Sequence, residues 1–179
     1  MLKFSIVIPV YNRPDEVDEL LQSLVGQTDK DFEVVVVEDG STVRCEDIYR
    51  KYSDSLDVKY FYKENSGPGQ SRNYGAERCS GNYIVILDSD VIVPQEYIAT
   101  LRRELTQDYC DTFGGIDAAD ESFSDMQKAV NYAMTSFFTT GGIRGGSRQM
   151  ERFHPRSFNL GMSREVFEAV GGFSAMRYG

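Results

Sequence analysis

Two aspartates interrupt an otherwise hydrophobic run in "NYIVILDSDVIVP" (82–94). Asp88 and Asp90 are two residues apart, so an extended backbone would turn both side chains to one side, with their Cα atoms roughly 6.5 Å apart. Carboxylate oxygens presented in this way bind hard divalent cations such as Mg²⁺ or Mn²⁺. A solvated turn at the end of a strand is the alternative interpretation, and the rest of the chain must decide between the two.

A second pair of carboxylates follows the most apolar run of the chain. Glu38 and Asp39 end "FEVVVVED" (32–39) and precede "GS", a typical turn sequence. Two adjacent carboxylates are more than a turn needs, and they could accept hydrogen bonds from a nucleobase N–H or a ribose hydroxyl. We therefore expect Glu38 and Asp39 to contact a ligand, with an ordinary turn as the alternative.

The segment "NSGPGQSRN" (65–73) has the composition of an anion-binding loop. Gly67 and Gly69 would let a ligand approach the backbone, and Arg72 would lie in the first turn of the following helix, beside its positive end. The segment does not match the dinucleotide-binding fingerprint, because the third glycine of GxGxxG would fall at the position of Arg72. An ordinary loop with an arginine in a surface ion pair is the alternative.

A longer basic and glycine-rich segment lies at 139–156, "TTGGIRGGSRQMERFHPR". Its composition is typical of a mobile loop, which could either close over a phosphorylated ligand or remain disordered. It contains the only histidine of the chain, and a lone histidine in such a loop is more often neither a metal ligand nor a catalyst. Its arginines and histidine are Arg144, Arg148, Arg152, His154 and Arg156.

The elements that must position these residues alternate between strands and helices. Strands are predicted from apolar runs at 4–10, 32–39, 58–63, 82–90 and 112–116. Helices are predicted at 14–27, 69–81, 95–105 and 124–138. This alternation predicts a Rossmann-like α/β fold, in which a mainly parallel sheet is flanked by helices. Because ligands of such sheets bind at the carboxyl ends of the strands, we expect the polar residues that follow the strands to share one edge.

Composition limits the function classes. The chain has 179 residues, 41% of them hydrophobic, and is expected to form one globular domain. Its net charge of −9 argues against nucleic acid as a partner. The three cysteines are far apart and suggest neither a disulfide framework nor a zinc site, so a reducing cytoplasm is expected. No apolar run is long enough to cross a membrane, and a membrane contact is expected to be peripheral at most.

Five segments, in this order, resemble the motifs of the family 2 glycosyltransferases of the GT-A fold. They are "FSIVIPVYN", "VVVVEDGS", "NSGPGQSRN", "YIVILDSD" and "FNLGMSREVFEAVGGF". The resemblance covers essentially the whole chain. It implies transfer of a sugar, usually with inversion, from a nucleoside diphosphate sugar to the hydroxyl of a saccharide or lipid-linked acceptor, as in polysaccharide biosynthesis. It also implies a UDP-sugar as the commonest donor, Mg²⁺ or Mn²⁺ as cofactor, and a place in the cytoplasm or at the inner face of the membrane.

The resemblance implies roles for the residues that follow the first three strands. Pro9 and Tyr11 match the motif that lines the nucleobase pocket. Glu38 and Asp39 match the residues that bind the base and the ribose, and Arg72 matches a residue near the base or the phosphates. The interpretation of these residues as ligand contacts is thereby favoured over that of ordinary turns.

The resemblance also assigns residues to the metal and to the sugar. Asp88 would lie close to the ribose or sugar and contribute to the metal site, whereas Asp90, the last acid of the DxD motif, would ligate the cation. Asn159 and Gly161 lie in the segment that borders the donor sugar and the acceptor. The carboxylates at 88 and 90 would then interrupt the apolar run because the strand ends in a metal and diphosphate site.

The C-terminal end departs from the family. There, an acidic motif that supplies the catalytic base follows shortly after "GGF", whereas the given chain ends at Gly179. No catalytic base is therefore assigned, and it is expected beyond Gly179. We expect a C-terminally truncated domain, with a nucleotide-binding half at 1–91, an incomplete acceptor-side half at 92–179, and poor activity for this chain alone.

Two other functions remain open at this point. A nucleotidyltransferase also binds nucleotides and a divalent cation on an α/β sheet, but it would be expected to carry a glycine-rich basic loop after its first strand, and "YNRPDEV" contains no glycine. A non-catalytic module that binds nucleotide sugars is the third interpretation, since no base is assigned.

Overall fold

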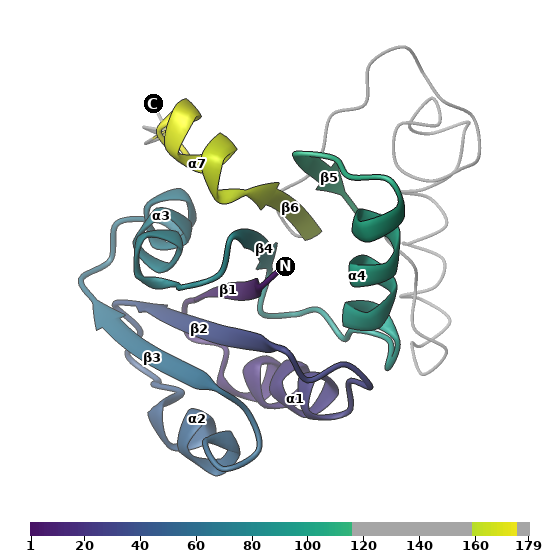
Figure 1. Ribbon diagram of the computed structural model, residues 1–179. Coiled ribbons are helices and arrows are strands. Elements are labelled where there is room, and N and C mark those ends of the chain that lie inside the picture. Colours follow the sequence, from purple (N-terminus) through teal and green to yellow (C-terminus); the bar gives the residue numbers. More distant parts are fainter. Residues whose placement is uncertain (116–158, 175–179) are drawn as a thin grey trace, which may run out of the picture.

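The structure is a computed structural model that describes residues 1–115 and 159–174. They form one six-stranded sheet with the strand order β3-β2-β1-β4-β6-β5 (Figure 1). The strands are β1 (Phe4–Val10), β2 (Phe32–Asp39), β3 (Val58–Lys63), β4 (Tyr83–Leu87), β5 (Thr112–Gly114) and β6 (Asn159–Ser163). The helices are α1 (Pro14–Val25), α2 (Glu46–Tyr52), α3 (Pro68–Arg78), α4 (Tyr97–Gln107) and α7 (Arg164–Val170).

The sheet is parallel in its first four strands and antiparallel at β6. β1 pairs with both β2 and β4 in parallel, and β3 extends the sheet beyond β2. β6 runs antiparallel to β4 and to β5. The prediction of a mainly parallel α/β sheet is confirmed. β6 was not expected as a strand, because "NLGMS" lacks the β-branched run that marks the other central strands.

Helices cover both faces of the sheet, which explains why its central strands are mainly apolar on both faces. α1, α2 and α4 lie on one face, and α3 and α7 lie on the other (Figure 1). Successive strand residues alternate between the two cores. Ile6 and Val34 pack toward α1, for example, and Val7 and Val35 pack toward α3. All eight residues of β2 are buried, since this strand lies between β1 and β3 and is covered by helices on both faces.

Several element boundaries differ from the sequence-based expectations. β4 ends at Leu87 instead of continuing to residue 90, so the two aspartates follow the strand. α3 ends at Arg78, three residues before Gly81, where the helix was expected to end. α2 was not expected, since "EDIYRKY" shows no regular apolar spacing, and its single buried residue is Tyr52. β5 is shorter than its predicted range of 112–116.

Two predicted features lie outside the described residues. They are the helix at 124–138 and the basic segment at 139–156, together with His154. The predictions made for these two segments remain untested. Within residues 1–115 and 159–174, no helix has both the length and the hydropathy needed to cross a membrane.

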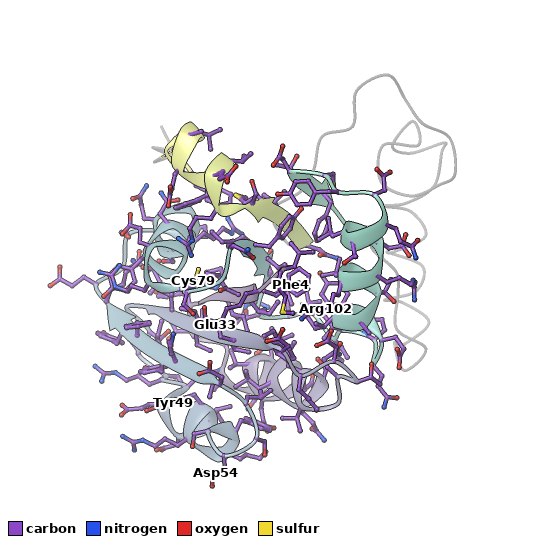
Figure 2. All side chains as sticks on the ribbon, in the orientation of Figure 1. Phe4, Glu33, Tyr49, Asp54, Cys79 and Arg102 are labelled. Atoms are coloured by element: carbon purple, nitrogen blue, oxygen red, sulfur yellow. The ribbon has the colours of Figure 1, made fainter. Side chains whose placement is uncertain are left out.

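The amino ends of the strands are held by a buried carboxylate. Glu33, labelled in Figure 2, is fully buried at the start of β2. It accepts hydrogen bonds from the hydroxyl of Ser5 (2.6 Å) and the backbone N–H of Gly81 (3.1 Å), and it pairs with Lys59 (2.6 Å). Burial opposes ionisation, but the hydrogen bonds from Lys59, Ser5 and Ser80 outweigh it and lower the pKa of Glu33 to about 2. Glu33 thus joins β1, β2, β3 and the loop before β4.

Candidate functional site

The carboxyl ends of β1 and β2 lie side by side, because Val10 is paired with Glu38 in parallel register. The loops that follow are joined by Asn12, which has a φ of 54°. Its backbone N–H donates to the hydroxyl of Ser41 (2.9 Å), and its Oδ1 accepts from the backbone N–H groups of Thr42 (2.8 Å) and Val43 (3.0 Å). Asn12 therefore fixes the shape of this edge of the sheet, a role that the sequence analysis missed.

Pro9 and Tyr11, the two residues assigned to a nucleobase pocket, differ in accessibility. Pro9 lies inside β1, opposite Val37, and is partly buried. Tyr11 follows the strand and is 54% exposed. Of the two, only Tyr11 offers an open aromatic face on which a planar ring could stack. Their contact with a base stays a prediction.

Glu38 lies in the core. It is fully buried, and its carboxylate accepts hydrogen bonds from the backbone N–H of Cys45 (3.1 Å) and from the hydroxyl of Tyr60. Burial and the neighbouring Glu38 raise the pKa of the Cys45 thiol to about 12, and they also raise the pKa of Tyr60. The carboxylate is used to attach the start of α2 to β2 and β3, and the predicted contact of Glu38 with a base or ribose is untested. The long apolar run gave no sign of this, since Tyr60 and Cys45 reach Glu38 from other elements.

Asp39 organises the glycine loop before α3. Its two carboxylate oxygens accept from the backbone N–H groups of Ser66 (2.9 Å) and Gly67 (2.9 Å), and the side chain also forms an ion pair with Lys63. It is 4% exposed. Asp39 thus lies at the predicted edge and links the ends of β2 and β3 to the start of α3. Its predicted contact with a base or ribose is untested.

Arg72 and Asp88 lie together, as the shared edge predicted. Arg72 Nη2 donates to Asp88 Oδ1 at 2.8 Å. Arg72 is 8% exposed, and its guanidinium lies 5.6 Å from the ring centroid of Phe173. The Nε atom of Arg72 is buried, and among the described residues it has no hydrogen-bond partner. A buried donor without a partner costs about 1–3 kcal/mol unless a ligand or water accepts its proton. Arg72 therefore keeps one buried donor that the described residues do not use.

Asp90 is turned to a different partner. Its side chain is 56% exposed and pairs with Arg13 Nη1 at 3.2 Å, and Arg13 also approaches Glu16 at 3.5 Å. The prediction that an extended strand turns Asp88 and Asp90 to one side is wrong, since β4 ends before them and Ser89 and Asp90 form a turn. Asp90 is open to solvent at the edge, whereas Asp88 is engaged by Arg72.

The carboxylates suit a divalent cation only in combination with a ligand. In the part of the chain that the structure describes, no group of three or more His, Cys, Asp or Glu side chains could hold a metal ion. Mg²⁺ and Mn²⁺ sites of nucleotide-binding proteins commonly use one or two carboxylates, with phosphate oxygens and water as the other ligands. An exposed carboxylate such as that of Asp90, which pairs with Arg13 at the surface, fits this pattern.

Asn159 and Gly161 lie on β6, next to β4. Asn159 is paired with Leu87, the residue before Asp88, and its Oδ1 accepts from the hydroxyl of Tyr97 at 2.6 Å. Gly161 is buried, and a Cβ at this position would lie 1.9 Å from Cε1 of Phe113. The glycine is thus explained by packing against an aromatic ring. The predicted roles of both residues at the donor sugar and acceptor remain untested.

Known proteins resemble this chain in sequence. The model of the family described as "Glycosyl transferase family 2" matches residues 5–171. Glycosyltransferase GlyA of Streptococcus pneumoniae is 36% identical over 111 residues, which cover 61% of this chain and 16% of GlyA. TarS of Staphylococcus aureus, a poly(ribitol-phosphate) β-N-acetylglucosaminyltransferase, is 34% identical over 115 residues, which cover 62% of this chain and 20% of TarS. The chain therefore spans only a minor part of these relatives.

Solved structures show the same fold. Residues 1–349 of S. aureus TarS, in complex with UDP-GlcNAc, match with a TM-score of 0.73 and 22% identity over 95% of this chain and 48% of that one. The mannosyltransferase PcManGT of Pyrobaculum calidifontis, in complex with GDP-Man and Mn²⁺, matches with a TM-score of 0.74 and 20% identity over 97% of this chain and 48% of that one. The fold is that of the GT-A glycosyltransferases. With its polar strand ends gathered at one edge of this sheet and the family model matching from residue 5 to residue 171, the chain belongs to glycosyl transferase family 2.

Proposed function

We propose that this chain binds a nucleoside diphosphate sugar and that it is the donor-binding part of an enzyme that transfers the sugar to an acceptor hydroxyl with inversion. The site is the edge formed by the ends of β1, β2 and β4 and the start of α3. Two of the structural neighbours are complexes with UDP-GlcNAc and with GDP-Man, which supports a donor of this class. We infer a UDP-sugar as the donor, and a saccharide or lipid-linked hydroxyl as the acceptor.

The observation that carries the proposal is the Arg72–Asp88 pair beside an open Asp90. Arg72 supplies positive charge in a nearly buried place and retains an Nε–H without a partner in residues 1–115 and 159–174. Asp88 fixes the guanidinium by accepting from Nη2 at 2.8 Å. A fixed, partly desolvated guanidinium binds phosphate or carbonyl oxygen more strongly than a flexible surface arginine does. The charge arrangement thus suits an anionic nucleotide.

We infer that Asp90, with Asp88 beside it in the chain, holds a divalent cation together with the diphosphate of the donor. The bound cation would offset the repulsion between carboxylates and phosphates and stabilise the negative charge of the departing nucleoside diphosphate. Arg13, which holds Asp90 in the structure, would then be free to move toward the phosphates. Asp39 and Asn12 keep the surrounding loops in place through their backbone hydrogen bonds.

Isothermal titration calorimetry tests the proposal. UDP, GDP and their sugar conjugates are titrated into the chain in the presence of Mn²⁺, Mg²⁺ or EDTA. We expect micromolar binding of one nucleoside diphosphate that weakens by at least about tenfold in EDTA. Asp90→Asn should abolish the dependence on the cation. Glu16→Gln is the matched control, because Glu16 also contacts Arg13 but lies on α1.

Two results would contradict the proposal. Equal binding in EDTA and Mn²⁺ by both wild type and Asp90→Asn would contradict a role for the cation. If no nucleoside diphosphate binds, the proposed donor class is wrong. If the chain instead formed a nucleoside triphosphate from a nucleotide sugar and pyrophosphate, it would be a nucleotidyltransferase.

A further inference from the structure

The segment after α7 is bound to α3 by one side chain. The carboxamide of Asn73 donates from Nδ2 to the backbone carbonyl of Phe173 (2.8 Å) and accepts at Oδ1 from the backbone N–H of the same residue (2.7 Å). The two residues are 100 positions apart in the sequence. Both backbone polar groups of Phe173 are therefore satisfied by Asn73, an arrangement that resembles a short piece of strand pairing.

The turn that brings Phe173 to α3 depends on two glycines. Gly171 and Gly172 have φ values of 75° and 73°. Other residues rarely adopt these angles. A Cβ at Gly172 would also lie 2.4 Å from Oδ1 of Asn73. The backbone of α7 thus ends in a left-handed turn that fits closely against this asparagine.

Phe173 in turn covers the arginine of the candidate site. Arg72 precedes Asn73 on α3, and its guanidinium lies 5.6 Å from the centroid of the Phe173 ring, within the range of a cation–π contact. The same guanidinium donates to Asp88. A continuous set of contacts therefore runs from Asn73 through Phe173 and Arg72 to Asp88, and it joins the C-terminal part of the described chain to the end of β4.

We propose that Asn73 is a positioning residue for nucleotide binding, which holds Phe173 over Arg72 and thereby keeps the guanidinium aligned with Asp88. This inference rests on the proposed function, because it assumes that the Arg72 edge binds a nucleoside diphosphate. Asn73 itself touches no reacting atom in this scheme. Its effect is to reduce the number of orientations that Arg72 can adopt before the ligand arrives, which lowers the entropic cost of binding.

The other end of α3 provides a matched control. Arg164, the first residue of α7, donates to the backbone carbonyls of Gly81 (2.9 Å), Cys79 (2.9 Å) and Ala76 (3.3 Å). It therefore attaches the same C-terminal part to the same helix, but at the helix end away from Arg72. A cation at this end also interacts favourably with the helix dipole. Arg164 should matter for stability and not for nucleotide affinity.

The experiment compares affinity and stability in the same variants of the 179-residue chain. The probe is UDP or GDP, whichever the wild type binds, with Mn²⁺. Asn73→Leu, which cannot form either hydrogen bond, should raise Kd by about tenfold. Phe173→Leu keeps both backbone hydrogen bonds but removes the ring, and it should raise Kd by about three- to tenfold. Phe173→Tyr keeps an aromatic ring and should bind to within about twofold of wild type. Arg164→Lys should lower Tm and leave Kd unchanged.

The outcomes separate this inference from the proposed function. If the wild type binds and both Asn73→Leu and Phe173→Leu bind equally well, the positioning role is overturned and the proposed function stands. If Arg164→Lys weakens binding as much as Asn73→Leu, the effect is one of general stability, and the positioning role is again overturned. If Asn73→Leu does not fold, the Phe173→Leu and Phe173→Tyr pair decides alone. If the wild type binds neither nucleotide, both the proposed function and this inference fail.

Discussion

The charged side chains at the two ends of the sheet differ in how completely the protein satisfies their hydrogen bonds. At the amino ends of the strands, Glu33 is fully buried and its oxygens accept from several protein donors. Arg102 lies over Phe4 at this end, with both residues labelled in Figure 2, and it is paired with Asp29. At the carboxyl ends, Arg72 retains an Nε without a partner in the described part of the chain, and Asp90 is more than half exposed.

We interpret this difference as one between charges that stabilise the fold and charges that can take part in ligand binding. Buried polar groups in folded proteins are almost always hydrogen-bonded, so an exception calls for a reason. The amino-end carboxylate has complete protein partners and should contribute to stability. Within residues 1–115 and 159–174 the carboxyl-end arginine is incompletely satisfied, and we predict that it contributes to binding. Substitutions at the two ends should therefore give opposite patterns of stability and affinity.

The largest expected effect is on stability at the amino end. Glu33→Leu removes the acceptor of the buried Ser5 hydroxyl and of the Ser80 backbone N–H, and it leaves Lys59 without its partner, whereas the backbone N–H of Gly81 can still donate to Ser5 Oγ. We expect a loss of about 3–5 kcal/mol in the free energy of unfolding. Urea denaturation measures this loss. Glu33→Gln keeps one acceptor oxygen but loses the negative charge, so it should cost less than Glu33→Leu while still being destabilising. An equal cost for the two variants would show that the charge, and not the remaining acceptor, determines the effect.

The pH dependence of the free energy of unfolding should reveal the contribution of Glu33. The pKa of Glu33 is about 2 in the folded state, compared with an ordinary value of 4.5. Because the folded pKa is the lower one, the stabilisation is complete above 4.5 and is lost as the pH falls toward 2, with a total of about 3 kcal/mol. Unfolding free energies measured between about pH 6 and pH 3 should fall for wild type. Glu33→Gln should lack this component, and parallel curves for the two proteins would contradict the assignment.

Substitution at the carboxyl end should affect binding and spare the fold. Arg72→Met removes the guanidinium and should weaken binding of the nucleoside diphosphate by about ten- to a hundredfold. The free energy of unfolding should change by about 1 kcal/mol or less, since Asp88, the residue that loses its partner, is about one-third exposed in its side chain (34%). Calorimetry and denaturation measure the two quantities on one preparation. A large loss of stability with unchanged affinity would make Arg72 a structural residue, like Glu33.

The smallest effect is expected at the exposed ion pair. Arg13→Ala frees Asp90 from its partner and should strengthen Mn²⁺ binding in the absence of nucleotide by about two- to threefold. Surface ion pairs contribute little, so stability should not change measurably. Titration of Mn²⁺ followed by electron paramagnetic resonance measures the affinity. Arg50→Ala is the control, because it removes a different exposed arginine, which lies on α2. Weaker Mn²⁺ binding by Arg13→Ala would show that Arg13 supports the cation site.

Much of the fold could be predicted from the apolar pattern. The predicted bounds of β1, β2 and β3 agree with the structure, because these strands are continuous runs rich in β-branched and aromatic residues. β6 and α2 were missed for the converse reason. "NLGMS" becomes a strand through pairing with β4 and β5, and "EDIYRKY" becomes a helix through packing against its neighbours, so neither carries a strong local signal.

For the candidate site, the sequence predicted the edge of the sheet where the polar residues meet, but not the hydrogen-bond partners of those residues. Parallel strands must end at the same side, so Asp39, Asp88 and Arg72 were expected near one another, and the Arg72–Asp88 contact is observed. No local pattern predicted that Glu38 would accept hydrogen bonds from Cys45 and Tyr60. Contacts of this kind join residues far apart in the chain, and no local spacing encodes them.

The sequence by itself determined which segments form buried strands, because these are the hydrophobic runs. It also determined where a ligand can approach, because polar residues follow those runs. Only the tertiary structure decided which of these polar residues remain free. Asn73 shows this most clearly, because its hydrogen bonds to Phe173 span 100 residues and depend on how α7 packs against α3. The physical reason is that burial and hydrogen-bond satisfaction are properties of neighbours in space, whereas the sequence specifies only neighbours along the chain.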